Sequence, residues 1–377
     1  FAVDLTSQPS ADVSFALSSS NTGEGTVSPA SLTFTTANWN LPQTVTATGV
    51  DDVVVDGDQT YSIVTDAITS ADGLYAGFNP SDVGVSNTDN DVASVTATPA
   101  AGLVTNETGA TATFALVLTS QPSADVTVPV SSSNVGEGTV APASITFTPA
   151  GWNLPQTVTV TGVDDFVADG SVAYSIVLGA ATSGDLQYSG FDPADVSATN
   201  GDNDLVGISV SPTAGLVTTE LGGTTSFSVR LNSQPTADVS IAVSSDDLTE
   251  GSPSPGSLTF TAANWNLPHA VIITGADDLV ADGAIGYSIV LAAATSADLG
   301  YAGQDAPDVS VSNTDNDAAG ITVTPTAGLL TSETGSSASF TVQLTSEPTA
   351  DVGIPVSSGN TAEGTVAPAS LPFTPVT

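Results

Sequence analysis

Acidic side chains recur at a fixed spacing along this 377-residue chain. A step of 113 residues relates three acidic sets: Asp51-Asp52, Asp164-Asp165 and Asp277-Asp278; Asp56, Asp169 and Asp282; and Asp91, Asp204 and Asp317. Carboxylate oxygens are the ligands that hard divalent cations prefer, and Ca²⁺ accepts about 6–8 of them in a flexible geometry. If the fold gathers these acids in one place, the chemistry it predicts is calcium binding.

The composition excludes most other chemistry. Asp and Glu total 40, while Lys and Arg total 1, so the formal net charge is −39 and a nucleic-acid or anionic-membrane binder is excluded. There is no Cys, no Lys and one His, so no nucleophile has a base beside it, and imidazole or thiolate metal sites are excluded. No apolar run approaches the roughly 18 residues of a membrane span. We therefore expect no catalytic residues and no membrane insertion.

The positioning elements follow the same 113-residue period, which is the size of one β-sandwich domain. Dividing the chain after each Asn-Asp pair gives four repeats, residues 1–91 (without its first strand), 92–204, 205–317 and 318–377 (truncated). In the second repeat, seven short segments mostly alternate apolar with small or polar residues: 95–99, 114–118, 126–130, 145–147, 157–161, 174–178 and 196–199. The prediction is an all-β chain of tandem seven-stranded immunoglobulin-like sandwiches, arranged end to end as a rod.

Successive turns of such a sandwich alternate between its two ends, so each loop can be assigned to an end. One end of the second repeat then collects Glu107, Glu137, Asp164, Asp165, Asp169, Asp202 and Asp204. Two charges about 8 Å apart repel by about 2 kcal/mol at an effective dielectric of about 20. Because no Lys or Arg lies nearby, a multivalent cation is the natural counterion.

The third repeat carries the clearest family resemblance. The order Thr-Thr-Glu220-Leu-Gly-Gly, Phe227-Ser-Val-Arg-Leu231, Leu258-Thr-Phe260, Asp277-Asp278-x-x-x-Asp282-Gly and Asn313-Thr-Asp-Asn-Asp317 resembles the Calx-β domain family. It is also similar to the long tandem arrays of such modules in bacterial surface proteins and adhesins. The resemblance implies a seven-stranded sandwich that binds clustered Ca²⁺ at one end.

The resemblance also implies a ligand set, carried over by position. It comprises Asp51, Asp52, Asp56, Asp89, Asp91, Glu107, Asp164, Asp165, Asp169, Asp202, Asp204, Glu220, Asp277, Asp278, Asp282, Asp315, Asp317 and Glu333. In this chain Asp56, Asp169 and Asp282 stand where the family more often has Glu. The acidic runs that end the repeats are interrupted by Asn90, Asn203 and Asn316, which are further candidate ligands.

Two sets of residues keep alternative interpretations open. Glu24, Glu137 and Glu250 face the acidic end, but each precedes Gly, and Glu-Gly is also a common turn. Trp39, Trp152 and Trp265, with Tyr75, Tyr188 and Tyr301, gather at the opposite end. These aromatic residues close the open end of the sandwich or pack against the neighbouring repeat; the alternative is that they stack on a sugar.

The function predicted from these features is non-enzymatic: a segment of a long extracellular, bacterial stalk, adhesin or filament, stiffened by calcium at the junctions between its domains. Its partners would be neighbouring repeats, other copies of the chain in a fibre, and a cell-surface or glycan receptor reached through domains outside these residues. The alternatives are a carbohydrate- or surface-binding module using the aromatic end, and a filament subunit assembled by strand complementation.

Overall fold

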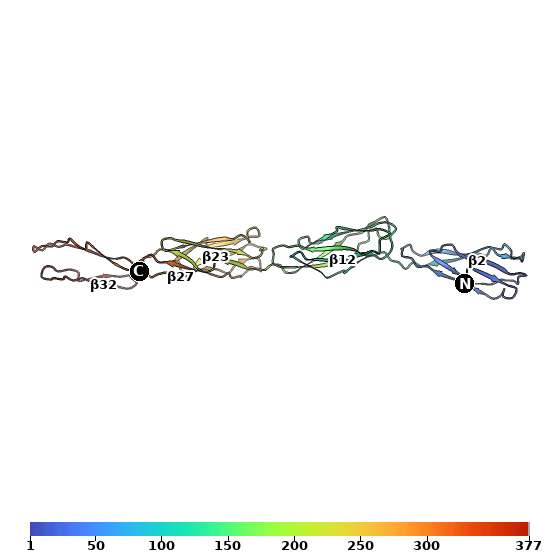
Figure 1. Ribbon diagram of the computed structural model, residues 1–377, viewed down its shortest axis with the longest axis horizontal. Helices are drawn as coiled ribbons and strands as arrows, with labels where there is room; N and C mark the ends of the chain where they lie inside the picture. The colour runs from blue at the N-terminus through green and yellow to red at the C-terminus, as the bar shows by residue number, and fades with distance from the viewer. Residues whose placement is uncertain (376–377) are drawn as a thin grey trace. The chain divides into compact units, whose positions relative to one another are not determined.

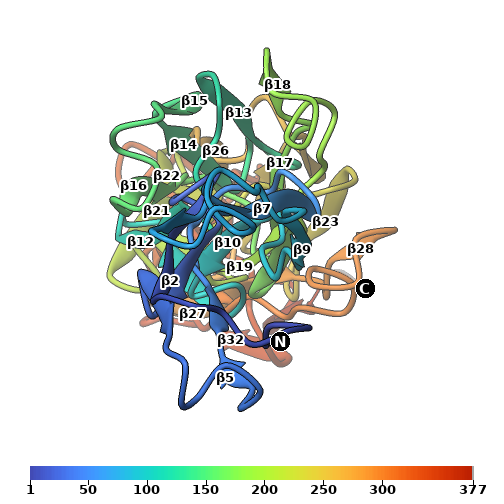
Figure 2. The same cartoon turned by 90° about the vertical axis from the view of Figure 1, so that its right-hand side faces the viewer.

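The computed structural model describes residues 1–375, which form strands joined by turns and loops (Figures 1 and 2). The Cα positions divide the chain into two compact units. The first contains Phe1–Asp165 and Gly170–Asp202, and the second contains Phe166–Asp169 and the residues from Asn203 onward. Over residues 1–375, no helical segment has the length and apolarity needed to span a membrane.

Repeat 2 shows the complete pattern of strands. They are β10 (Val95–Thr98), β11 (Leu103–Asn106), β12 (Thr111–Leu118), β13 (Val126–Ser132), β14 (Gly138–Ala141), β15 (Ser144–Phe147), β16 (Gln156–Gly162), β17 (Val172–Leu178), β18 (Thr182–Ser183) and β19 (Val196–Gly201). One sheet has the order β10-β12-β16-β14. The other has the order β11-β19-β17-β13-β15, with β18 paired to β13. The predicted all-β sandwich is confirmed, and β11, β14 and β18 are additions to the seven predicted strands.

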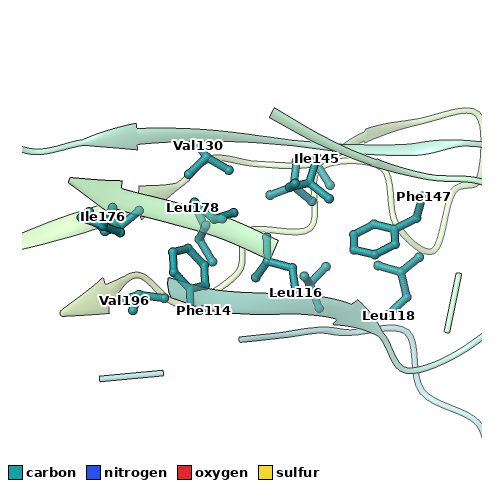
Figure 3. Close-up of a cluster of buried hydrophobic side chains, with 14 of the residues drawn as sticks. Phe114, Leu116, Leu118, Val130, Ile145, Phe147, Ile176, Leu178 and Val196 are labelled. Carbon is teal, nitrogen blue, oxygen red and sulfur yellow. The ribbon is translucent and has the colours of Figure 1, made fainter. Parts of the chain in front are cut away.

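Alternation along these strands builds the core between the two sheets. In the last five residues of β12, β16 and β17, buried side chains alternate with partly exposed ones. Phe114 and Leu116 of one sheet pack in the same apolar cluster as Ile145, Phe147 and Leu178 of the other (Figure 3). A period of two residues places successive side chains on opposite faces of a strand, which is why small and polar residues occupy the outer positions.

The first strand of the repeat is divided between the two sheets. Pro99 follows β10 directly, and Gly102, with φ of +76°, lets the chain turn into β11. The strand β11 then pairs in parallel with β19, with Asn106 opposite Gly201. This parallel register ends both strands at the same edge, so the residues that follow them emerge together.

Repeat 1 repeats most of this pattern. Its strands are β1 (Ala2–Val3), β2 (Val13–Ser19), β3 (Gly25–Ser28), β4 (Ser31–Phe34), β5 (Gln43–Thr44), β6 (Thr46–Gly49), β7 (Gln59–Thr65), β8 (Thr69–Ser70) and β9 (Val83–Asn87). The strands β4, β2, β7 and β9 form one sheet in that order.

In repeat 3 the order of strands matches that of repeat 2. They are β20 (Ile208–Ser211), β21 (Leu216–Thr219), β22 (Thr224–Leu231), β23 (Val239–Ser245), β24 (Gly251–Ser254), β25 (Ser257–Phe260), β26 (His269–Gly275), β27 (Ile285–Leu291), β28 (Thr295–Ser296) and β29 (Val309–Thr314). Here β21 pairs in parallel with β29, with Thr219 opposite Thr314. Repeat 4 contributes β30 (Ile321–Thr324), β31 (Thr341–Leu344), β32 (Val352–Pro355) and β33 (Ser370–Phe373).

Candidate metal centre

The acids of repeat 1 line one surface pocket. Its wall carries six carboxylates: Glu24, Asp51, Asp52, Asp56, Asp89 and Asp91. Glu24, Asp52 and Asp56 each present an oxygen to a group whose members all lie within 4.8 Å of one another. Asn90 lies in the same pocket and donates its Nδ2 to Asp51 Oδ1 at 3.1 Å. All the ligands predicted for this repeat are therefore brought together, and Glu24, for which a turn was the alternative interpretation, lies with them.

Repeat 3 contains two such groups. In the first, Glu220, Asp315 and Asp317 bring one oxygen each within 4.8 Å of the others. In the second, Glu250, Asp278 and Asp282 do the same. The remaining predicted residues are also close, since Asn316 Nδ2 donates to Asp277 Oδ1 at 2.9 Å.

The parallel pair β21 and β29 positions the first group. Because Thr219 lies opposite Thr314, Glu220 and Asp315 follow the two strands side by side. The backbone N–H of Asn316 then donates to Glu220 Oε2 at 2.8 Å, and that of Gly283 donates to Asp315 Oδ2 at 2.7 Å. Backbone donors therefore fix these carboxylates from two directions.

A buried asparagine positions the second group, and the sequence reasoning missed it. Asn313, which is 1% exposed, accepts from Thr218 Oγ1 at 2.9 Å and donates Nδ2 to Ala276 O at 2.9 Å and to Glu250 Oε2 at 3.4 Å. Asn87 and Asn200 hold Glu24 and Glu137 in the same way, at 3.2 and 3.4 Å. The available signal was an Asn at an inward-facing position of the last strand in every complete repeat.

The glycine after each of these glutamates is required for space. A Cβ on Gly25, Gly138 or Gly251 would overlap the ring and hydroxyl of Tyr61, Tyr174 or Tyr287. None of these glycines has a positive φ. The Glu-Gly pair is therefore a close approach between a strand end and a buried tyrosine, with the glutamate directed toward the acidic group.

One carboxylate oxygen tests whether this centre fits a cation. Asp317 Oδ2 is buried and has no hydrogen-bond partner, although its backbone N–H donates to Asp315 Oδ1. Buried polar atoms are nearly always satisfied, and a buried acceptor with no donor points to an unrecorded cation or water. Hard oxygen donors from carboxylates are the ligands of Ca²⁺. The donor set of repeat 3 fits a divalent cation.

Within this group, the pKa values of Asp315 and Asp317 are shifted in opposite directions. Loss of hydration on burial, then the charges of Asp315, Asp277 and Asp278, raise the pKa of Asp317. Backbone N–H donors from Gly283 and Asp317 lower the pKa of Asp315. In repeat 1 the pKa of Asp91 is raised and that of Asp89 is lowered for the same reasons. Each centre thus pairs a firmly ionised aspartate with one that holds its proton more readily.

The pKa values of two glutamates in repeat 3 are raised, like that of Asp317. A backbone bond from Asn316 lowers the pKa of Glu220, but burial and the charges of Asp315, Asp278 and Asp317 outweigh it, so the net shift is upward. Burial also raises the pKa of Glu250, although its bond to Asn313 opposes the shift. Without a cation, ionisation of Glu220, Glu250 and Asp317 costs more free energy than ionisation of the same side chains in water.

The remaining predicted ligands divide as follows. In the first compact unit, Glu107 and Glu137 are buried, Asp202 Oδ2 accepts from the Gly170 N–H at 2.7 Å, and Asp164 and Asp165 lie in the loop after β16. Asp169, Asn203 and Asp204 belong to the second unit. Glu333 of repeat 4 is exposed and joins no acidic group within residues 1–375.

The aromatic residues at the other end are built into their own repeats. Trp39, Trp152 and Trp265 are half-buried and pack against the core of the repeat that carries them. Tyr188 and Tyr301 are 1% exposed, and their hydroxyls bond Ser120 and Ser233. These tyrosines therefore offer no free ring face to a sugar.

Comparison with known proteins finds remote similarity to solved structures. No protein-family model matches the chain, and no curated protein matches it. Similar solved structures include CBD12 from CALX1.2 (15% identity over 54% of this chain and 81% of that one, TM-score 0.26) and the calcium binding domain CBD12 of CALX1.1 (14%, 53% and 80%, 0.26). Domains 4–9 of surface layer protein SbsC are similar at 14% identity over 84% of this chain and 41% of that one, with a TM-score of 0.23.

Proposed function

We propose that this chain is a non-enzymatic structural segment of a long extracellular, bacterial stalk, adhesin or filament, stiffened by Ca²⁺ at the acidic ends of its repeats. The observation that carries the proposal is the buried, partnerless Oδ2 of Asp317 beside Asp315 and Glu220. A cation would give that oxygen a partner. It would also neutralise carboxylates for which the chain supplies one Lys or Arg residue, Arg230.

The chain's own residues supply the rest of the centre. Backbone N–H groups and the buried Asn313 hold the carboxylates close together before any ion arrives. A preorganised site loses little conformational freedom on binding, which favours affinity. Bound Ca²⁺ would supply positive charge and coordination bonds that join loops distant in sequence.

Load bearing is proposed from the position of these acids along the chain. In the first unit, Asp91 is followed within four residues by Val95, the first residue of β10. In the second unit, Asp317 is followed within four residues by Ile321, the first residue of β30. An ion that fixes Asp91 or Asp317 therefore also fixes the start of the next repeat. Successive repeats held in this way would form the proposed rod.

Direct binding tests the proposal. Isothermal titration of the full chain, first stripped with chelator, should show saturable heat with Ca²⁺ and weaker binding of Mg²⁺, which demands a stricter octahedral geometry. At a free Ca²⁺ concentration of about 100 times Kd, a single site stabilises its repeat by about 2.7 kcal/mol, visible as a higher Tm in calorimetry. Absence of both heat and a Tm shift would leave the acids as solvated turns and refute the proposal.

A further inference from the structure

A recurring backbone contact joins the acidic loops to turns 68 residues further along. The third residue of each Asp-Asp-Xaa loop (residues 51–53, 164–166 and 277–279) accepts a hydrogen bond through its carbonyl oxygen. In the first unit the Gln121 N–H donates to Val53 O at 2.6 Å. In the second unit the N–H groups of Gln234 and Glu347 donate to Phe166 O and Leu279 O. We call the donor segments 121–122, 234–235 and 347–348 the docking turns.

The docking turn is a prepared surface in its own right. The Gln121 side chain donates Nε2 to Pro149 O at 2.9 Å, and that of Gln234 donates to Ala262 O at 2.9 Å. These bonds tie two of the three turns to the loops that carry Trp152 and Trp265. A proline follows the donor residue in every docking turn and disfavours the helical conformation for it. The residue that donates the backbone N–H is therefore tied, in these two turns, to the loop that carries the tryptophan.

The side chain of the third loop residue is apolar in all three loops, although it follows two aspartates. Val53, Phe166 and Leu279 are 41%, 54% and 63% exposed. The ring centroid of Phe166 lies 5.9 Å from that of Trp265, with the planes tilted by 43°. Aromatic pairs in this range of separation attract each other beyond their buried area. Phe166 thus presents both a carbonyl acceptor and an apolar side chain, the first to the docking turn 234–235 and the second to Trp265.

We propose that docking turns 121–122 and 234–235, with the loops that carry Trp152 and Trp265, are interaction surfaces for the third loop residues Val53 and Phe166, and that the side chain of this third residue sets how firmly loop and turn dock. The contact itself uses a backbone hydrogen bond and apolar surfaces and no carboxylate. Phe docks more firmly than Val at this position, because the larger side chain buries more area and pairs with the tryptophan ring.

The second compact unit offers a loss-of-contact test. In the full chain with Trp39→Phe and Trp152→Phe, Trp265 is the single tryptophan fluorophore. Phe166→Ala should increase acrylamide quenching of Trp265 and hydrogen exchange at the Gln234 amide. The expected change in exchange is about 2- to 10-fold, the size of one aromatic pair. Leu186→Ala, at a residue 90% exposed, is the matched control and should change neither signal.

Both measurements are made in chelator and in Ca²⁺. Equal changes in the two conditions support docking as an interface separate from the metal centre. Unchanged exchange and quenching would overturn the proposal, and so would changes that appear in Ca²⁺ alone. Neither of these results would refute calcium binding itself, which titration measures separately.

The first unit offers a gain-of-contact test. Since the chain has no Cys, Ser31→Cys and Ser144→Cys, at exposed positions of β4 and β15, can be spin-labelled selectively in the full chain. Val53→Phe should narrow the distribution of distances between the labels measured by pulsed electron resonance, and Val53→Gly should broaden it. Indistinguishable distributions would contradict the assignment of the third loop residue as the determinant of docking.

Discussion

At the scale of single residues, two aspartates separated by one position have opposite properties. Asp315 accepts two backbone N–H bonds, which lower its pKa, while burial and neighbouring charges raise the pKa of Asp317 and leave its Oδ2 without a donor. The difference arises from where the backbone donors point, since the two side chains are chemically identical. A cation would relieve the unfavourable member of the pair.

Asp317→Asn should therefore have effects of opposite sign in two conditions. In chelator the Tm of repeat 3 should rise, because the variant removes a like charge from the cluster. In Ca²⁺ the Tm should fall below that of the unmodified chain, because a ligand is lost. Calorimetry of both proteins in both buffers checks whether the change in Tm has opposite signs in chelator and in Ca²⁺. Asp305→Asn, at an exposed loop position, is the control and should shift neither Tm.

The directions of the pKa shifts also predict that, in chelator, the stability of the chain first rises and then falls as the pH is lowered. In chelator, stability should rise as pH falls through the raised pKa values of Asp317, Glu250 and Asp91, since the folded chain then binds more protons than the unfolded one. Further acidification should reduce it as Asp315 and Asp89, whose pKa values are lowered, take up protons. In Ca²⁺ the added stability should shrink as pH falls, because protons compete with the ion.

A series of melting curves from neutral to acid pH, with and without Ca²⁺, measures both trends. Stability that falls steadily with acidification in chelator, with no initial rise, would show that the raised acids carry no strain in the cation-free chain.

At the scale of elements, the parallel pairing of β21 with β29 brings together the first acidic group of repeat 3, and β11 pairs with β19 in the same way in repeat 2. Antiparallel hairpins alone would place the end of one strand beside the start of the next. The parallel register aligns two strand ends instead, so Glu220 and Asp315 leave the sheet together. The close approach of Gly251 to Tyr287 then brings Glu250 to the same end of the sandwich.

Gly251→Ala should disturb this end of repeat 3. The added methyl group overlaps Tyr287, so the strand or the ring must move, and overpacking of this kind costs about 1–3 kcal/mol. Chemical unfolding should show this loss of stability. Titration should show weaker Ca²⁺ binding, because Glu250 moves with its neighbour Gly251. Gly256→Ala is the matched control, since the nearest atom to its Cβ lies 3.9 Å away and no positive φ is involved. Equal stability of the two variants would contradict the packing argument.

At the scale of the whole molecule, 40 acidic residues face one arginine. Ordinary salt screens such charge without binding at defined positions, and at about 0.15 M the Debye length is already about 8 Å. Site binding by Ca²⁺ and general screening therefore predict different responses to concentration.

The Tm of the full chain should rise with Ca²⁺ along a saturating curve and with NaCl along a gradual one that persists at high concentration. Calorimetry over matched ionic strengths separates the two. A NaCl response equal to that of Ca²⁺ at every ionic strength would favour a charge-for-solubility explanation, as in salt-adapted proteins, over defined sites.

The sequence by itself determined the fold class, the 113-residue period and the gathering of acids in repeats 1 and 3. Those conclusions needed only the alternation of apolar residues, which is a local property, and the parity of successive turns. The tertiary structure decided the rest. It showed that Asn313 positions Glu250, that Glu24 and Glu250 belong to the carboxylate groups, and that Gly251 is required because a Cβ there would overlap Tyr287. Each of these findings depends on a contact between residues far apart in the sequence. The contact between Phe166 and Trp265 likewise joins residues 99 positions apart, a separation at which no local pattern indicates proximity.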